Sequence, residues 1–255
     1  MNTTTTFSLK STDADGSNGW GFSWDTSSDC ATECAQSALT AEAADKAGLK
    51  RNYTVSGIEI DNSVPTATLV WPADSRTYKG YIAMGATTAS DAVKMFFEYS
   101  PDGTNWYAIG TDFADSNGWN VTWDTRGVAD GTTYRTRATA TDNVGLTHTA
   151  TNGADITLDN TLPVVNLTAP ASGSFVNGIV SVTYTSSEGL KVPYLSIDGG
   201  EFFNVTASGS FSWNTSAYND GAHTLQAKDN DTVNNTGFSR IVSVIVDNAN
   251  PVVSL

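Results

Sequence analysis

Three Asp-Asn pairs are the residues of this chain with the best claim to bind a metal ion. They are Asp61-Asn62, Asp159-Asn160 and Asp247-Asn248, and each ends an alternating apolar stretch and is followed three residues later by a proline. Carboxylate and amide oxygens are the hard ligands that Ca²⁺ prefers. The pairs therefore make calcium the one cofactor that the sequence suggests. Turn formation by Asp and Asn ahead of proline is the structural alternative.

Catalytic residues, in contrast, are scarce. The two histidines, His148 and His223, both fall in expected strands. The sequence has no Ser/His/Asp arrangement, no phosphate-binding glycine loop and no His-x-x-x-His spacing. Glu98, Glu188 and Glu201 are isolated carboxylates, which are usually solvated side chains. We therefore expect no catalytic residues and no enzyme activity.

Two kinds of covalent modification are expected. Cys30 and Cys34 are the only cysteines, and without a neighbouring histidine they cannot complete a tetrahedral zinc site. We predict that they form a small loop disulfide in an oxidising compartment. Asn-x-Ser/Thr sequons are slightly more frequent than chance in so Ser/Thr-rich a chain. Besides Asn2, the candidate glycosylation positions are Asn52, Asn120, Asn166, Asn204, Asn214, Asn230 and Asn234.

Aromatic residues recur in pairs that share one face of a strand. Trp24, Trp123 and Trp213 each follow an apolar residue at a spacing of two, namely Phe22, Val121 and Phe211. Residues two apart in a strand point to the same side of a sheet. We expect these pairs to pack in a core, and an exposed aromatic platform for carbohydrate is the alternative.

Composition and charge exclude several classes of partner. The chain has 27 acidic and 13 basic residues, a net charge of −14, and no Lys/Arg cluster, so nucleic acid would be repelled. No apolar run reaches the roughly 18–20 residues that cross a bilayer. Abundant Thr, Ser, Gly, Asp and Asn, with apolar residues in alternation, indicate strands and turns.

The same three markers recur along the chain in the same order. The Asp-Asn pairs are 98 and 88 residues apart. Trp24-Asp25-Thr26, Trp123-Asp124-Thr125 and Trp213-Asn214-Thr215 are 99 and 90 residues apart. An Asp-x-x-Gly turn follows at Asp45 and Asp142, and we place a longer variant at Asp229. A shared period of about 90 residues predicts tandem domains.

Within one period, alternation and turn residues predict about seven short strands. In the second repeat these cover 67–71, 78–86, 93–99, 106–109, 120–123, 134–141 and 147–158. Such a pattern is typical of a two-sheet sandwich. The predicted fold class is therefore all-β, as tandem immunoglobulin-like β-sandwiches with an incomplete first repeat.

The sequence also resembles a known family. The stretches Pro163-Val-Val-Asn-Leu-Thr-Ala-Pro-Ala-Ser-Gly173, Phe211-Ser-Trp-Asn-Thr215 and Asp220-Gly-Ala-His-Thr-Leu-Gln-Ala-Lys-Asp229 are similar to bacterial and archaeal immunoglobulin-like (Big) domains. This resemblance implies modules in series in surface proteins, adhesins and secreted hydrolases. It implies no reaction.

These observations together predict an organisation and a role. We expect the C-terminal part of a truncated repeat over 1–62, complete domains over 63–160 and 161–248, and the first strand of a further repeat over 249–255. The expected role is a non-catalytic extracellular module, a stalk, spacer, adhesive or surface-layer segment of a larger cell-surface protein. Its partners would be neighbouring repeats, other surface proteins or carbohydrate. One alternative is an accessory spacer or carbohydrate-binding region of a secreted polysaccharide hydrolase, and another is a filament subunit assembling by strand complementation.

Overall fold

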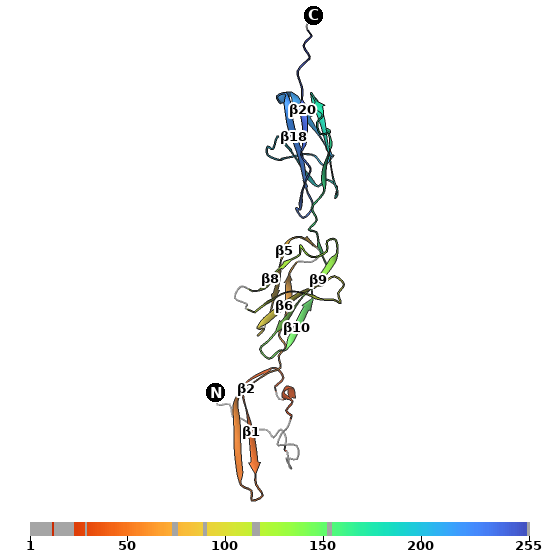
Figure 1. Cartoon of the computed structure of the whole chain (residues 1–255). Coiled ribbons are helices and arrows are strands. Elements are labelled where there is room, and N and C mark those ends of the chain that lie inside the picture. The colour runs from red at the N-terminus through yellow and green to blue at the C-terminus, as the bar shows by residue number, and fades with distance from the viewer. Residues whose placement is uncertain are drawn as a thin grey trace.

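The chain folds into β-structure arranged in successive units along one long axis (Figure 1). The computed structural model describes residues 12, 23–28, 30–72, 76–88, 91–113, 118–151 and 155–253. Within these ranges the only helical elements are short 3-10 turns, including η1 (Thr26–Ser28) and η3 (Thr215–Ala217). The predicted all-β class is confirmed.

The second repeat is a complete two-sheet sandwich. Its strands are β3 (Thr68–Trp71), β4 (Thr77–Tyr78), β5 (Tyr81–Thr87), β6 (Lys94–Ser100), β7 (Tyr107–Asp112), β8 (Trp119–Asp124), β9 (Thr133–Thr141), β10 (Thr147–Thr151) and β11 (Ile156–Leu158). One sheet has the order β3-β5-β8, and the other has the order β4-β11-β9-β6-β7 with β10 also paired to β9. All of these pairings are antiparallel except that of β4 with β11.

The third repeat has the same strand order. Its strands are β12 (Val165–Ala169), β13 (Phe175–Val176), β14 (Ile179–Ser186), β15 (Val192–Ile197), β16 (Phe203–Asn204), β17 (Ser210–Asn214), β18 (Gly221–Asn230), β19 (Thr236–Phe238) and β20 (Val242–Val246). The sheets are β12-β14-β17 and β13-β20-β18-β15-β16, with β19 paired to β18. Two repeats of different sequence have therefore built one topology.

Each sandwich has its own hydrophobic core because its strands alternate. In β9 every second residue is buried, and Ala138 and Ala140 are fully enclosed with Phe97 of β6. The corresponding core of the third repeat includes Leu195 and Val244. The two buried clusters share no residue, so each sandwich can be stable on its own interior.

Both sandwiches contain nine strands where the sequence predicts about seven. The first strand of each crosses from one sheet to the other, which divides it into β3 and β4 or into β12 and β13. Pro72 and Pro170 lie at this crossing, and proline has no N–H with which to continue a ladder. The last predicted strand of the second repeat, 147–158, is divided into β10 and β11.

The first repeat contributes a long hairpin within the described residues. β1 (Glu33–Ala44) pairs with β2 (Lys50–Asp61), and η1 precedes them. Most of β2 is exposed, including Tyr53 at 73%. The predicted segment ahead of Trp24 lies almost entirely outside the described residues. The predicted further strand over 249–255 is in no strand as far as residue 253, and residues 254 and 255 lie outside the described part.

Candidate metal centres at the domain junctions

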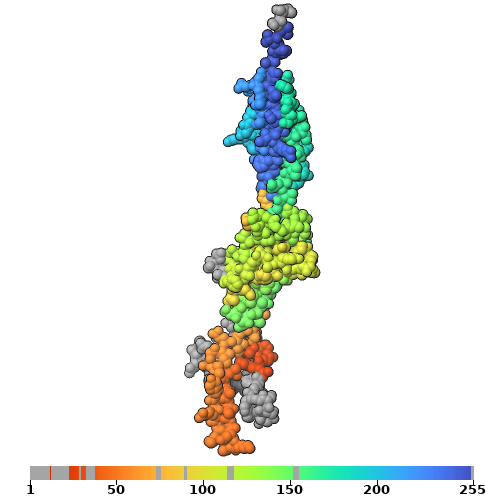
Figure 2. Space-filling model, in the orientation of Figure 1, coloured from red at the N-terminus to blue at the C-terminus, as the bar shows by residue number. Residues whose placement is uncertain are grey.

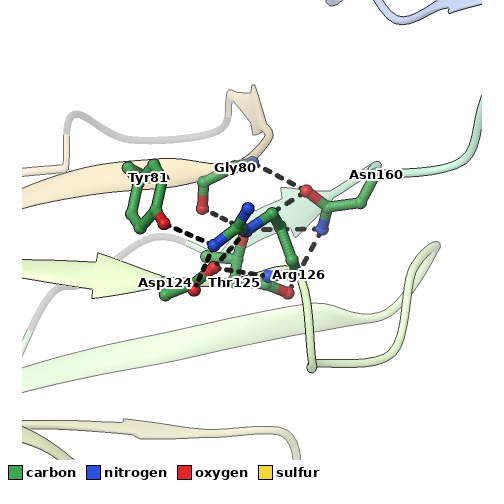
Figure 3. A network of polar contacts seen from close by, with 6 residues as sticks. All are labelled: Gly80, Tyr81, Asp124, Thr125, Arg126 and Asn160. Carbon is green, nitrogen blue, oxygen red and sulfur yellow. Dashed lines mark hydrogen bonds and ion pairs between the residues drawn. The ribbon is translucent and has the colours of Figure 1, made fainter.

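Two of the three repeated markers meet at the end of each sandwich. In the second sandwich the Asn160 side chain accepts a hydrogen bond from the Gly80 backbone N–H at 2.7 Å and donates to the Thr125 carbonyl at 3.2 Å (Figure 3). The Thr125 hydroxyl and N–H both donate to the Gly80 carbonyl, at 2.8 and 2.9 Å. Asn160 also donates to Asp130 at 3.1 Å. We call this arrangement the Thr-Asn lock.

The same lock closes the other repeats. In the third, Asn248 donates to the Thr215 carbonyl at 3.0 Å and accepts from its hydroxyl at 3.1 Å. In the first, Asn62 accepts from the Thr26 hydroxyl at 3.3 Å and donates to the Cys30 carbonyl at 2.7 Å. The asparagine of every Asp-Asn pair is thus occupied inside its own repeat.

The residue between Trp and Thr in this marker has a local role. In the second sandwich Asp124 accepts two hydrogen bonds from the Arg126 guanidinium, at 2.9 and 2.8 Å. The side-chain hydrogen bond from Arg126 lowers the pKa of Asp124 to about 2. The same guanidinium contacts Tyr81, with its carbon 4.5 Å from the ring centroid (Figure 3). In the third sandwich Asn214 takes the place of the aspartate and caps η3.

The third marker forms an identical aspartate turn in all three repeats. Asp142 accepts from the backbone N–H of the residues two and four positions later, both at 2.9 Å. Asp45 does so at 2.8 and 2.9 Å, and Asp231 at 2.8 Å in both cases. The placement of this marker at Asp229 is therefore wrong, and the turn begins at Asp231. Asn234, with a φ of 66°, takes the left-handed position that Gly145 holds in the second repeat.

At the first junction three carboxylates from two repeats converge. Asp61 ends β2, while Asp91 and Asp142 belong to the loops ahead of β6 and β10. One carboxylate oxygen from each lies within 4.8 Å of the other two. Asp142 is 3% exposed, and its second oxygen, Oδ2, has no hydrogen-bond partner among the described residues.

At the second junction the equivalent carboxylates converge again. Asp159 follows β11, and Glu188 and Asp231 belong to the loops ahead of β15 and β19. Their oxygens also lie within 4.8 Å of one another. Here the amide of Asn235 donates to Asp231 Oδ2 at 2.8 Å and to the Asp159 carbonyl at 2.9 Å.

The second cluster is electrostatically crowded. Burial raises the pKa of Glu188, and the neighbouring charges of Asp159, Asp231 and Asp229 raise it further. The Lys191 ammonium opposes this rise, but it is the weakest of these influences. Within the described ranges, no ion pair joins any of the six clustered carboxylates to a lysine or arginine.

The predicted metal-binding pairs are therefore divided between two places. Asp61 and Asp159 reach the clusters, whereas Asn62, Asn160 and Asn248 lie in the locks. Asp247 follows β20 in the same way as Asp159, but the described residues bring no other acidic group to it in such a cluster. The loop acids were not predicted as ligands from the sequence. The recurring Asp-x-x-Gly turn was the signal that could have identified Asp142.

The remaining polar candidates are separated and have structural partners. Glu98 is paired with Arg137 at 2.6 Å. His148 accepts the Ala67 backbone N–H at 3.1 Å, and His223 contacts Asp198 at 2.7 Å. Glu201 is exposed. These side chains lie on different elements and do not converge.

The candidates for modification can be placed in part. Cys30 is buried and bonded in a disulfide, and the chain's other cysteine is Cys34, whose side chain lies outside the described residues. Asn2 also lies outside them. Six sequon asparagines are exposed and Asn230 is half-buried; the six are Asn52, Asn120, Asn166, Asn204, Asn214 and Asn234.

The aromatic pairs lie on inward faces of the complete sandwiches. Trp123 is 4% exposed and Trp213 2%, while Val121 and Phe211 are half-buried beside them. Trp123 stacks on Tyr99 with ring centroids 4.6 Å apart. Trp24 is half-buried, and Phe22 lies outside the described residues. Burial of both tryptophans removes the two best candidates for a sugar-binding platform.

Three solved structures illustrate what the chain is similar to. The fibronectin(III)-like modules of Clostridium thermocellum CbhA are 21% identical, with 72% of this chain and 94% of that chain covered and a TM-score of 0.39. A 1.5-MDa bacterial ice-binding adhesin is 17% identical, with 83% and 74% covered and a TM-score of 0.40. A tetra-tandem repeat from the extending region of a large adhesion protein is 20% identical, with 84% and 58% covered and a TM-score of 0.32.

Sequence comparison gives a more limited result. No curated protein matches the chain. In the described part of the chain there is no helix with the length and apolar character needed to cross a bilayer. Residues 163–227 match the family of bacterial Ig domains. The third sandwich is therefore a bacterial immunoglobulin-like domain, as its motifs predict.

Proposed function

We propose that this chain is a non-catalytic extracellular spacer, a stalk segment that separates other parts of a larger bacterial cell-surface protein. The observation that carries the proposal is the serial arrangement of sandwiches with separate cores (Figure 1). Modules in series gain reach with each copy. Bacterial immunoglobulin-like domains are also typical of surface and secreted proteins.

The chemistry of the surface supports a passive role. The net charge of −14 keeps such a segment soluble and repels similar chains. Glu98, His148 and His223 are each engaged in structural contacts, so no nucleophile and base are brought together among the described residues. A role in spacing needs only stable modules and restrained joints.

Small-angle X-ray scattering on the full chain tests this function. A spacer should scatter as an elongated monomer whose maximum dimension greatly exceeds that of one sandwich, at every concentration. A compact particle would contradict the proposal. Growth into polymers would favour strand complementation, and retention on insoluble polysaccharide would favour the hydrolase-associated alternative.

A further inference from the structure

We propose that each junction is a Ca²⁺ site shared by two consecutive repeats. The first site comprises Asp61, Asp91 and Asp142, and the second comprises Asp159, Glu188 and Asp231. In each, the first carboxylate comes from the end of one repeat and the other two come from loops of the next.

The strongest observation is an unused oxygen in the first cluster. Asp142 is almost fully buried, and one of its carboxylate oxygens already accepts two backbone N–H groups. The other, Oδ2, has no partner in the part of the chain that the structure describes, although a buried carboxylate oxygen without one is costly. Acidic neighbours at Asp61 and Asp91 make this cost higher. A cation in the cluster would satisfy all three carboxylates at once.

The second observation is that the two clusters are equivalent in the fold. Each cluster takes one acid from the end of a repeat and one from the aspartate turn of the next. The remaining acid comes from the loop between β5 and β6 at the first junction, and from the loop between β14 and β15 at the second. The middle position changes from Asp91 to Glu188, so the charge is kept while the residue changes. Exposed acids meeting by accident would not be expected to occupy the same three places at both junctions.

The chemistry of the ligands selects the ion. All ligand atoms are carboxylate oxygens, so ions that favour nitrogen or sulfur, such as Zn²⁺, are disfavoured. Ca²⁺ accepts 6–8 oxygens in irregular geometry and can use carboxylates in bidentate fashion, whereas Mg²⁺ requires a near-ideal octahedron and keeps its water. Loops from separate modules suit the more permissive ion.

Because each site joins two consecutive repeats, a bound ion would affect how the repeats move relative to each other. Figure 2 shows the molecule narrowing between the second and third sandwiches. A narrow neck offers little apolar area, so domains joined in this way are expected to move relative to each other. An ion bound by both sides would restrain that motion. An extended spacer could still exist without it, so the two proposals can fail separately.

Isothermal titration calorimetry of the full chain with CaCl₂ tests the sites. We expect two bound ions, with MgCl₂ at equal concentration displacing neither. Asp91→Asn and Glu188→Gln change exposed side chains and should each leave one ion bound. The affinity of the altered site should fall by at least about 10–100-fold, the usual cost of disturbing even a ligand's supporting partner.

Asp247→Asn is the matched control. Asp247 also follows the last strand of a repeat and caps a backbone N–H, but it is in no cluster within the described residues. This variant should keep both ions. Absence of binding at millimolar CaCl₂, an unchanged stoichiometry in Asp91→Asn and Glu188→Gln, or an equal loss in Asp247→Asn would each overturn the proposal. Displacement by Mg²⁺ would overturn the assignment of Ca²⁺.

A second readout does not depend on calorimetry. Scattering in CaCl₂ should give a narrower distribution of end-to-end distances than scattering in chelator, and Asp61→Asn should lose part of that difference. Asn at this position can still accept the Ser63 N–H that Asp61 accepts at 2.9 Å, so the local turn is preserved. Identical curves with and without Ca²⁺ would contradict a restraining ion.

Discussion

The two junctions bring together equivalent acids but treat the buried aspartate differently. At the first junction Leu146 stands where the second has Asn235, and Asp142 Oδ2 finds no hydrogen-bond partner within the described ranges. At the second, Asn235 donates to the equivalent oxygen of Asp231 and reaches across to Asp159. A side-chain amide of the protein thus partly satisfies, at the second junction, the buried aspartate oxygen that lacks such a donor at the first. The first junction should therefore depend more on a cation.

A substitution at Gly237 gives the largest expected difference between the junctions. An added Cβ would lie 1.7 Å from the Pro163 carbonyl oxygen, and backbone there cannot easily yield. Gly237→Ala should destabilise the third sandwich by at least about 3 kcal/mol. For a domain of this size the thermal midpoint should fall by more than about 10 °C. Differential scanning calorimetry of the full chain measures this directly.

The first junction provides the counterpart. His148 occupies the position equivalent to Gly237 and accepts the Ala67 N–H. His148→Ala should therefore cost only about 0.5–1.5 kcal/mol, the worth of one hydrogen bond. Gly127→Ala, where an added Cβ meets nothing within 4 Å, is the neutral control. A Gly237→Ala midpoint close to that of Gly127→Ala would refute the close approach.

Exchanging Asn235 and Leu146, the residues that distinguish the two junctions, tests most directly whether the first junction depends more on a cation. Asn235→Leu removes both amide hydrogen bonds and leaves a buried carboxylate oxygen unpaired, so unfolding of the third sandwich in chelator should be easier by about 1–3 kcal/mol. CaCl₂ should restore most of the loss. The reverse exchange, Leu146→Asn, should reduce the gain in thermal midpoint that Ca²⁺ gives at the first junction. Equal responses of both junctions before and after exchange would remove the distinction.

The Thr-Asn locks should also differ in strength. The Asn160 side chain contacts Gly80, Thr125 and Asp130, while the Asn62 side chain has two partners in the described residues, Thr26 and Cys30. Asn160→Ala should lower the stability of its repeat by about 2 kcal/mol and Asn62→Ala by about 1 kcal/mol. Urea unfolding followed by tryptophan fluorescence measures both. The exposed Asn143→Ala serves as a control, and a larger loss in Asn62→Ala would reverse the expected order.

The smallest expected effect is a pH dependence confined to the third sandwich. The hydrogen bond to Asp198 and that to the Asn219 carbonyl raise the pKa of His223 above its ordinary value of 6.5. The native state therefore favours protonated His223, so this contribution is complete below pH 6.5 and is lost as pH rises through the elevated pKa.

Because the Asp198 side chain is 43% exposed, solvent limits the contribution to about 0.2–1 kcal/mol. The thermal midpoint of the third sandwich should fall slightly between pH 6 and pH 9 relative to that of the second. His223→Gln should abolish this relative drift. A relative midpoint that rises over the same range would contradict the sign.

Sequence patterns predicted the fold because they are local. Strand alternation and turn residues are set by neighbouring positions, and the period of about 90 residues repeats the same local pattern, which both sandwiches follow. The break after Trp71 was predicted, but the division of 78–86 into β4 and β5 was not, because a two-residue strand is too short to show alternation of its own.

The sites were predicted only in part, since they depend on distant contacts. Asp159 and Asn160 are adjacent in sequence and share one predicted role. In the structure, however, Asp159 lies in the acidic cluster, whereas Asn160 forms the Thr-Asn lock. The partner Thr125 is 35 residues away from Asn160, and no local pattern joins them. Asp91 and Glu188 lie in loops of different sequence. Their equivalence follows only from the strand order that the two sandwiches share.

The second repeat carries two of the cluster acids at its N-terminal end and one at its C-terminal end, and this affects how arrays of such repeats can change in length. The second sandwich brings two acidic loops at its entrance and presents one aspartate at its exit, and the third has the same arrangement with Asp247 at its exit. Any unit inserted or removed in the same orientation would recreate a full set of three at the new joint, with no further substitution. The protein could therefore be lengthened or shortened by recombination alone.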